Sequence, residues 1–467
     1  MISFFPRQIS YKAITTYSFA LIAISLFYYH YAMPWGYMVL GVLMVIGFFL
    51  LTSSWSYGWR LLPGRRFEKR VFGVALSLRL VWVFASYFYY IAVTGIPFEI
   101  DAADSRGYYD MAVWLHACSW SDIWEYIRVT SSSSISDIGY PLYLGLLSKA
   151  FGVSVLVPRT IKALISSYSC ILLYRLASRT FGEEPGRMAG IMCALMPNFI
   201  IYCGYHLKET EMVFLEVAFL ERLDYLFRSR KINVWTILLP TLLAGSLFFF
   251  RTVLGAAAVF SAVTGVVLST TPSLKKGWRR SVLIGWGLLC IVMLGGGTIA
   301  TELEGYWEER EENVVKKRTE QTSRGNQWAM YATGTVMAPM VVVLPFSTMV
   351  DTGQTSQLTR HGGNYIRNFM GILAILAIVE AFRRKTWRDF SMIGSFVIAY
   401  LGVVSLSGFS NSERFLLPGL PCLILLWTYG IASLRQSTFK LLNPWCLVVF
   451  LMEFGWAFFK LGSRGLL

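Results

Sequence analysis

Two apolar runs joined by a basic loop decide the fold, and in residues 35–93 they read WGYMVLGVLMVIGFFLLTSSWSYGWRLLPGRRFEKRVFGVALSLRLVWVFASYFYYIAV. Each run is about 20 residues long, which suits a helix crossing a hydrocarbon core of about 30 Å. The loop between them carries five cations: Arg60, Arg65, Arg66, Lys69 and Arg70. Lys and Arg collect in the cytoplasmic loops of membrane proteins, so we expect this loop in the cytoplasm and the end of the run 71–93 outside.

The same pattern continues along the whole chain of 467 residues, of which 55% are hydrophobic and 15% are charged. Soluble domains carry about a quarter charged residues. We therefore predict an all-α integral membrane protein, a polytopic helical bundle of about thirteen transmembrane helices with two extracytoplasmic loop regions. The ten-residue alternating segments of a membrane β-barrel are not seen.

The basic balance of the chain, a net charge of +15, comes from short clusters of cations between apolar runs. This placement indicates cytoplasmic loops, and we expect no nucleic-acid partner. The seven cysteines show no CxxC spacing. The sequence therefore predicts neither a disulfide framework nor a structural zinc site.

The apolar runs and charge clusters divide the chain into four regions. We expect an N-terminal two-span extension with a cytoplasmic loop at 1–70, a transmembrane core at 71–300 containing the first external loop 94–154, a second external loop region at 301–364 and C-terminal transmembrane helices at 365–467. Both external regions contain apolar stretches that we do not expect to span. Residues 111–127 predict an interfacial helix, followed by a flexible serine run at 131–134, and residues 336–350 predict an interfacial or re-entrant segment.

Two aspartates follow the third span, at Asp101 and Asp104. A carboxylate on the external face could act as general base on an acceptor hydroxyl or amine. The alternative is structural, because Asp104 and Ser105 precede a predicted helix at 108–115 and either side chain could cap it.

Further charged residues lie at the outer ends of predicted spans, where the charge rule expects few cations. They are His206, Lys208, Glu209, Arg251 and Arg414. Charged side chains at the end of a span often serve only as anchors, because they extend into the polar membrane interface. Three cations on this face nevertheless suggest an anionic partner, and a lipid phosphate or diphosphate would supply one, because guanidinium binds phosphate oxygens in a bidentate manner.

Five stretches carry a family resemblance, and in order they read DSRGYYDMA (104–112), GYPLY (139–143), PRTIKALISSYSCILLYRLASRTFG (158–182), MPNFIIYCGYHLKET (196–210) and RFLLPGLP (414–421). They resemble the GT-C membrane glycosyltransferases, which include the aminoarabinose transferases and the protein O-mannosyltransferases. Ser105 stands where that family often has a second acidic residue. The resemblance therefore does not extend to a carboxylate pair or to a metal held by such a pair.

The resemblance implies a GT-C-like fold and a hexosyl- or pentosyltransferase of the cell envelope. It implies roles for individual residues: Asp104 as catalytic base with Asp101 as substitute or helper, Arg251, Arg414 and Lys208 on the donor phosphate, and Glu209, His206 and Tyr108 lining the substrate site. The donor would be a polyprenyl-phosphate-linked sugar, and the acceptor a lipid, a glycan or a protein. The site would face the extracytoplasmic side of the cell membrane, surrounded by membrane lipids.

No Gly-rich nucleotide loop is evident, which fits a lipid-linked donor. The sequence predicts no organic cofactor and leaves a divalent cation open. Two other functions compete: a polysaccharide polymerase or ligase, and a transporter or flippase of lipid-linked sugars. The last predicts ionisable residues deep within spans. The candidates for that role are Arg79, Glu216, Glu221 and Glu453.

Overall fold

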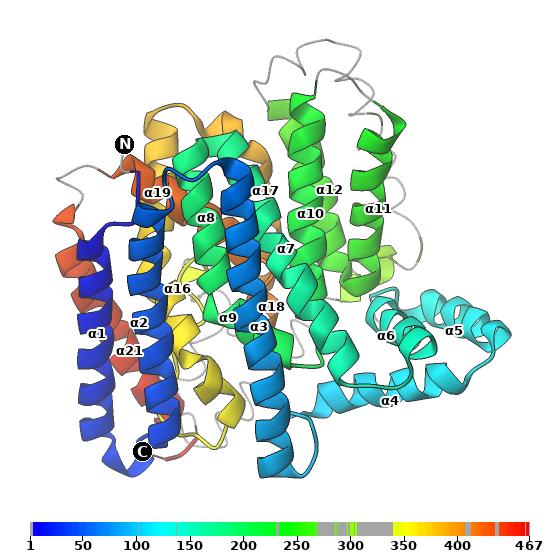
Figure 1. Cartoon of the computed structure of the whole chain (residues 1–467), viewed down its shortest axis with the longest axis horizontal. Helices are drawn as coiled ribbons and strands as arrows, with labels where there is room; N and C mark the ends of the chain where they lie inside the picture. Colours follow the sequence, from blue (N-terminus) through cyan, green and yellow to red (C-terminus); the bar gives the residue numbers. More distant parts are fainter. Residues whose placement is uncertain are drawn as a thin grey trace.

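The structure, a computed structural model, is a bundle of α-helices (Figure 1). It describes residues 3–100, 102–136, 138–229, 233–268, 340–406, 412–434, 439–462 and 464–466, with isolated positions between 285 and 305. Within these residues no strand forms, and an isolated antiparallel bridge pairs Ala32 with Val350. The predicted all-α class is confirmed for this part of the chain.

Seven helical segments among the described residues are long and apolar enough to cross a membrane: α1 (Arg7–Phe27), α2 (Trp35–Gly58), α3 (Gly64–Thr94), α7 (Leu156–Phe181), α16 (Thr355–Arg383), η6 with α17 (Trp387–Phe390 and Ser391–Leu406) and α21 (Leu442–Gly462). A bent segment raises the count to eight if it is one span: α8 (Glu183–Leu195), α9 (Pro197–Ile201) and η2 (Tyr202–Gly204). The chain is therefore a helical membrane protein.

Four further helices complete the bundle: α10 (Glu209–Arg228), α11 (Val234–Phe250), α12 (Thr252–Leu268) and α19 (Leu420–Ser433). The last three are apolar but shorter than 18 residues. The short α18 (Glu413–Leu416) precedes α19. Most of the span expected at 281–300 lies outside the described residues, so the total of about thirteen spans stays a prediction.

The two helices of the N-terminal extension pack on the C-terminal part of the chain. Helix α1 lies against α21, and α2 lies against α16. Both begin directly after a proline, Pro6 for α1 and Pro34 for α2. Proline suits this place because its missing N–H would have no partner in the first turn of a helix. Helices α1 and α2 therefore form one side of the bundle.

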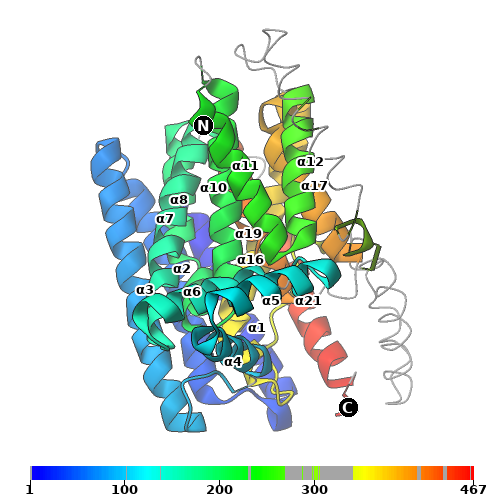
Figure 2. The same ribbon diagram turned by 90° about the vertical axis from the view of Figure 1, so that its right-hand side faces the viewer.

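Three short helices occupy the predicted first external loop: α4 (Ala103–Ala117), α5 (Trp120–Ser133) and α6 (Gly139–Phe151). Helices α4 and α5 run crosswise to the long helices (Figures 1 and 2). Trp120 and Trp124 are exposed on α5, as expected for an interfacial helix. The expected flexible connection at 131–134 is wrong, because α5 continues through Ser133 and the hydroxyl of Ser131 donates to the carbonyl of Arg128 at 3.0 Å.

The basic turns lie at one end of the bundle. In Figure 1 the connections α2–α3 and α16–η6 lie at the upper end, together with the end of α10 and the start of α11. The α3–α4 connection lies at the lower end, and the α11–α12 junction lies about halfway down. The upper connections carry cations such as Arg65, Arg228 and Arg384. This arrangement agrees with the charge pattern of the sequence, and Glu209 and Arg251 lie at the ends of α10 and α11 away from these basic turns.

The described part of the expected re-entrant segment, residues 340–350, forms turns and extended chain rather than a helix. The side chain of Asn368 on α16 donates to the carbonyl of Pro345 at 2.8 Å and accepts from the N–H of Ser347 at 3.2 Å. Irregular backbone within a membrane protein needs such internal partners. This part does not cross the bundle, as expected.

A break between α8 and α9 turns the chain toward the lower end of the bundle. Pro197 lacks an N–H, so the carbonyl of Cys193 loses its usual helical partner. The guanidinium of Arg79 donates to the carbonyls of Cys193 and Ala194, both at 3.1 Å, and the two helices meet at 47°. Arg79, a candidate for a transport path in the sequence, therefore stabilises a helix break.

Candidate functional site

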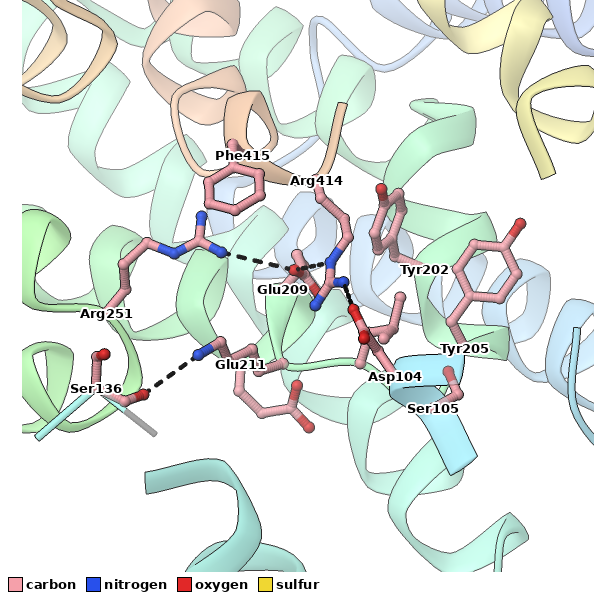
Figure 3. Close-up of polar contacts among 12 residues, drawn as sticks. Asp104, Ser105, Ser136, Tyr202, Tyr205, Glu209, Glu211, Arg251, Arg414 and Phe415 are labelled. Carbon is pink, nitrogen blue, oxygen red and sulfur yellow. Dashed lines mark hydrogen bonds and ion pairs between the residues drawn. The ribbon is translucent and has the colours of Figure 1, made fainter. Parts of the chain in front are cut away.

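Arg414 joins two carboxylates from distant parts of the chain. Its Nε lies 2.7 Å from Oε1 of Glu209 at the start of α10, and its Nη1 pairs with Asp104 in the first turn of α4 (Figure 3). Glu209 is fully buried, whereas the side chain of Asp104 is 59% exposed. Burial would lower the pKa of Arg414, but Glu209 and Asp104 outweigh it and raise the pKa. The guanidinium is therefore charged and held between an inner and an outer anion.

Arg251 reaches the same carboxylate from the junction of α11 and α12. Its Nη2 lies 3.9 Å from Oε1 of Glu209, and its guanidinium carbon lies 4.1 Å from the ring centre of Phe415 (Figure 3). Its Nη1 also donates to the hydroxyl of Tyr400 at 3.2 Å. Arg251 is 4% exposed. Two arginines from separate elements thus converge on one buried carboxylate.

The remaining predicted site residues lie near Glu209 and its two arginines. Lys208 donates to the carbonyl of Ser136 at 3.2 Å, so it points toward the α5–α6 connection. The ring of Tyr108 packs edge-on against Tyr140 with centroids 4.8 Å apart. His206 is 1% exposed, and burial, together with Lys162 and Arg159, lowers its pKa well below the usual range. His206 is therefore neutral near pH 7.

The structure contradicts the capping role for Asp104. Helix α4 begins at Ala103 with Ala102 at the N-cap position, and no side chain caps it. Asp104 lies inside the first turn, and its side chain turns to Arg414 instead. The hydroxyl of Ser105 donates to Glu99. Asp101 lies outside the described residues, so its expected role as substitute or helper is not tested.

The cations of this face have anionic partners within the protein, contrary to the expectation that a bound phosphate supplies them. Glu209 and Asp104 pair with Arg414, and Glu209 also faces Arg251. A further carboxylate, Glu302, accepts from the hydroxyl of Thr252, the neighbour of Arg251. A phosphate at this site would have to compete with these carboxylates.

A buried polar cluster fixes the segment that carries Arg414. Glu413, its neighbour, is paired with Arg360 at 2.7 Å and accepts from Asn198 at 2.6 Å and from Asn364 at 3.5 Å. Burial raises the pKa of Glu413, with Arg360 opposing the shift. Sequence reasoning did not single out Arg360 or Asn364, which lie at the end of the predicted external region 301–364, just before the predicted span 365–382. Arg360 and Asn364 hold α18 against α16, and Asn198 holds it against α9.

A second buried cation, Lys162 of α7, fixes the turn before α10. It donates to the carbonyl of Tyr205 at 2.9 Å and to that of Leu207, and its Nζ lies 3.6 Å from Oε2 of Glu211. The turn between these carbonyls and α10 carries His206, Lys208 and Glu209. Sequence reasoning missed Lys162, although it lies within a stretch that carries the family resemblance, because a single lysine inside an apolar run gives no spacing signal.

The structure therefore brings Asp104, Glu209, Arg251 and Arg414 together (Figure 3). Tyr108 lies one helical turn from Asp104 on α4, and His206 and Lys208 lie in the turn before α10. Across the described residues, no group of three His, Cys, Asp or Glu side chains is placed to hold a metal ion. No model of a known protein family matches this chain, and no curated protein matches it either.

Proposed function

We propose that this chain is a membrane glycosyltransferase that moves a sugar from a polyprenyl-phosphate donor to a lipid, glycan or protein acceptor on the extracytoplasmic face. The observation that carries the proposal is the contact between Asp104 and Arg414. It places an exposed carboxylate, suited to accept a proton, beside a guanidinium suited to bind phosphate. Both belong to the stretches that resemble GT-C glycosyltransferases.

The reaction follows from these two groups. The acceptor oxygen or nitrogen attacks the anomeric carbon, its proton passes to the Asp104 carboxylate, and the bond from the anomeric carbon to the phosphate oxygen breaks. The lipid phosphate leaves with the bonding electron pair. Arg414 and Arg251 would stabilise the charge that develops on the leaving oxygen, which is the main electrostatic task in such a transfer.

An apolar groove supports a lipid-linked donor. It has a volume of about 300 Å³ and lies between α2, α3 and α9, with lining residues that include Met44, Trp82 and Ile201. Trp82 donates its indole N–H to the carbonyl of Ile201 at 3.1 Å. Tyr202 and Tyr205, which come next in the chain, lie beside Arg414 and Asp104 (Figure 3). An isoprenoid chain in this groove would have its phosphate directed toward the arginines.

The competing functions have less support. A transporter or flippase predicts free ionisable residues within spans. Three of the four candidates have a partner within the fold: Arg79 caps a helix break, Glu221 pairs with Arg179 at 2.8 Å, and Glu216 lies 3.5 Å from the thiol of Cys422. The fourth, Glu453 of α21, is buried and has no hydrogen-bond partner among the described residues, as a transport path predicts. A polysaccharide polymerase or ligase shares the donor chemistry but is expected to rely on arginines more than on a carboxylate, so the position of Asp104 beside Arg414 favours the transferase.

The proposal is tested by the release of polyprenyl phosphate. The full-length chain in nanodiscs is incubated with labelled polyprenyl-phosphate hexose or pentose and with membrane extract as the source of acceptor. We expect lipid phosphate to appear in step with label in lipid, glycan or protein. Movement of intact donor between leaflets without release of phosphate would instead identify a flippase.

A further inference from the structure

A second group of polar side chains lies on the other side of the first turn of α10. We call it the Tyr140 cluster: Tyr140 and Tyr143 of α6, His206 of the turn, and Thr210 and Glu211 of α10. Tyr140, His206, Thr210 and Glu211 are each at most 4% exposed. The polar atoms of all five side chains are buried and have no hydrogen-bond partner in the part of the chain that the structure describes.

These side chains lie close together. The ring centroids of Tyr140 and Tyr143 are 6.1 Å apart, and those of Tyr140 and His206 are 6.3 Å apart. Lys162 connects the aromatic and acidic parts, because its Nζ lies 5.1 Å from the ring centre of Tyr140 and 3.6 Å from Oε2 of Glu211. The cluster is therefore one local environment.

Such a concentration of unsatisfied groups needs an explanation. Buried polar groups in native proteins nearly always have a partner, and leaving one without a partner costs about 1–3 kcal/mol. A residue that serves only packing would be Phe or Leu here. Among the described residues, Lys162 pairs with Glu211, and the other four side chains have no hydrogen-bond partner. We infer that ordered water or a polar ligand satisfies them, and the position of the cluster next to Glu209 and its two arginines favours a ligand.

The helix geometry separates two halves of one site. Glu209 and Glu211 lie two residues apart, so they point to nearly opposite sides of α10. Glu209 faces the two arginines, whereas Glu211 faces Lys162 and the tyrosines. Asp104 and Tyr108 lie four residues apart on one face of α4, with Asp104 on Arg414 and Tyr108 on Tyr140.

The chemistry of the cluster fits a neutral hydroxylated ring. The Glu211 carboxylate accepts hydrogen bonds, the tyrosine and threonine hydroxyls both donate and accept, and neutral His206 offers one donor and one acceptor. The aromatic faces of Tyr108 and Tyr140 suit the C–H surface of a sugar. A phosphate fits poorly, because Glu211 would repel it and Lys162 already donates to two carbonyls.

We propose that Tyr140, Tyr143 and Glu211 form the subsite for the transferred sugar, whose phosphate lies at Arg251 and Arg414. This inference rests on the proposed function, and it adds the residues that distinguish a sugar-bearing donor from the bare lipid phosphate. His206 and Thr210 complete the hydrogen bonds to the ring. Lys162 is a positioning residue that orients Glu211.

The test compares two probes, decaprenyl phosphate and a panel of decaprenyl-phosphate hexoses and pentoses, on the full-length chain in nanodiscs. Binding is measured by native mass spectrometry and thermal melting. We expect the wild type to prefer at least one sugar-bearing lipid. Tyr143→Phe and Glu211→Gln should each reduce that preference about tenfold, while affinity for decaprenyl phosphate stays unchanged.

Tyr28→Phe is a matched control. Tyr28 is also a buried tyrosine whose hydroxyl has no partner among the described residues. It directly follows α1, which is not part of the site. Tyr28→Phe should leave the preference intact. Without lipid, Tyr143→Phe should melt at or above the wild-type temperature, because it removes an unsatisfied buried hydroxyl. A lower melting temperature would reveal a partner within the fold and overturn the inference.

The outcomes separate the two proposals. Retention of the sugar preference in both variants would overturn the sugar subsite and leave the proposed function standing, with water as the partner of the cluster. A wild type that binds neither kind of lipid would refute the proposed function, and the sugar subsite with it.

Discussion

Glu209→Gln should make the protein less stable and at the same time bind lipid phosphate more tightly. Glu209 is the buried anion between Arg414 and Arg251, at 2.7 and 3.9 Å. Gln keeps the shape of the side chain but removes its charge. Removing one partner of a buried ion pair costs about 3–5 kcal/mol. Arg414 retains Asp104, so we expect the lower value, about 3 kcal/mol, or roughly a hundredfold in the unfolding equilibrium.

The same change removes the carboxylate with which a phosphate has to compete. We therefore expect decaprenyl phosphate to restore most of the lost stability, since a ligand at a hundred times its dissociation constant contributes about 2.7 kcal/mol. The assay is an unfolding titration of the full chain in mixed micelles, with and without the lipid. The lipid should stabilise Glu209→Gln more than the wild type.

Asp224→Asn is the matched control. Asp224 is a carboxylate with a side chain 7% exposed that pairs with Arg179 at 2.8 Å and with Arg228 at 2.7 Å, on the α10 end opposite Glu209. Its loss should also destabilise the protein, but decaprenyl phosphate should not restore it. Equal rescue of both variants, or no rescue of Glu209→Gln, would refute the assignment of the two arginines to a phosphate.

Three further predictions follow from the site and the topology. Arg251→Ala and Arg414→Ala should each weaken binding of decaprenyl phosphate by about 1.5–3 kcal/mol, or ten- to a hundredfold, in a lipid-binding titration, and unchanged affinity would leave both as interface residues. A cysteine at exposed Ser121 should react with an impermeant reagent only from outside, and one at exposed Arg65 only from the cytoplasm, whereas the reverse pattern would relocate the site. His206 has a lowered pKa in the folded chain, so the unfolded chain takes up a proton at this residue first as the pH falls through about 6.5. The stability of the wild type should therefore decrease more steeply from pH 7 to 5 than that of His206→Gln, by up to about 1.4 kcal/mol per pH unit. Parallel stability curves for the two proteins would contradict a buried neutral His206.

Much of the fold follows from apolar length and charge, and the exceptions have local causes. The predicted spans at 35–54 and 71–93 correspond to α2 and α3, each extended by several residues into its polar flank. The predicted span at 188–204 is instead broken at Pro197, because hydropathy does not register a missing backbone N–H. Arg79, about 120 positions earlier in the chain, donates to a carbonyl that this break leaves without its helical partner, and the local sequence gives no sign of that contact.

The candidate site could be predicted from sequence only through residues at unusual positions. Arg251 and Arg414 could be predicted because cations are rare at the outer ends of spans. Asp104 could be predicted because it opens a stretch that carries the family resemblance. Arg360, Lys162 and Glu211 could not, because each lies in or beside a span and acquires its meaning from a partner on another helix. The competition of Glu209 with a phosphate also became visible only in three dimensions.

The most direct test of the proposed transferase is the rate of polyprenyl phosphate release by Asp104→Asn. Asn keeps the size of the side chain but cannot take the acceptor proton, and a positioned carboxylate contributes typically 10²–10⁴-fold. We predict a rate at least about a hundredfold below wild type at equal protein level, with binding of decaprenyl phosphate retained. An Asp104→Asn protein that transfers sugar at the wild-type rate would contradict the account.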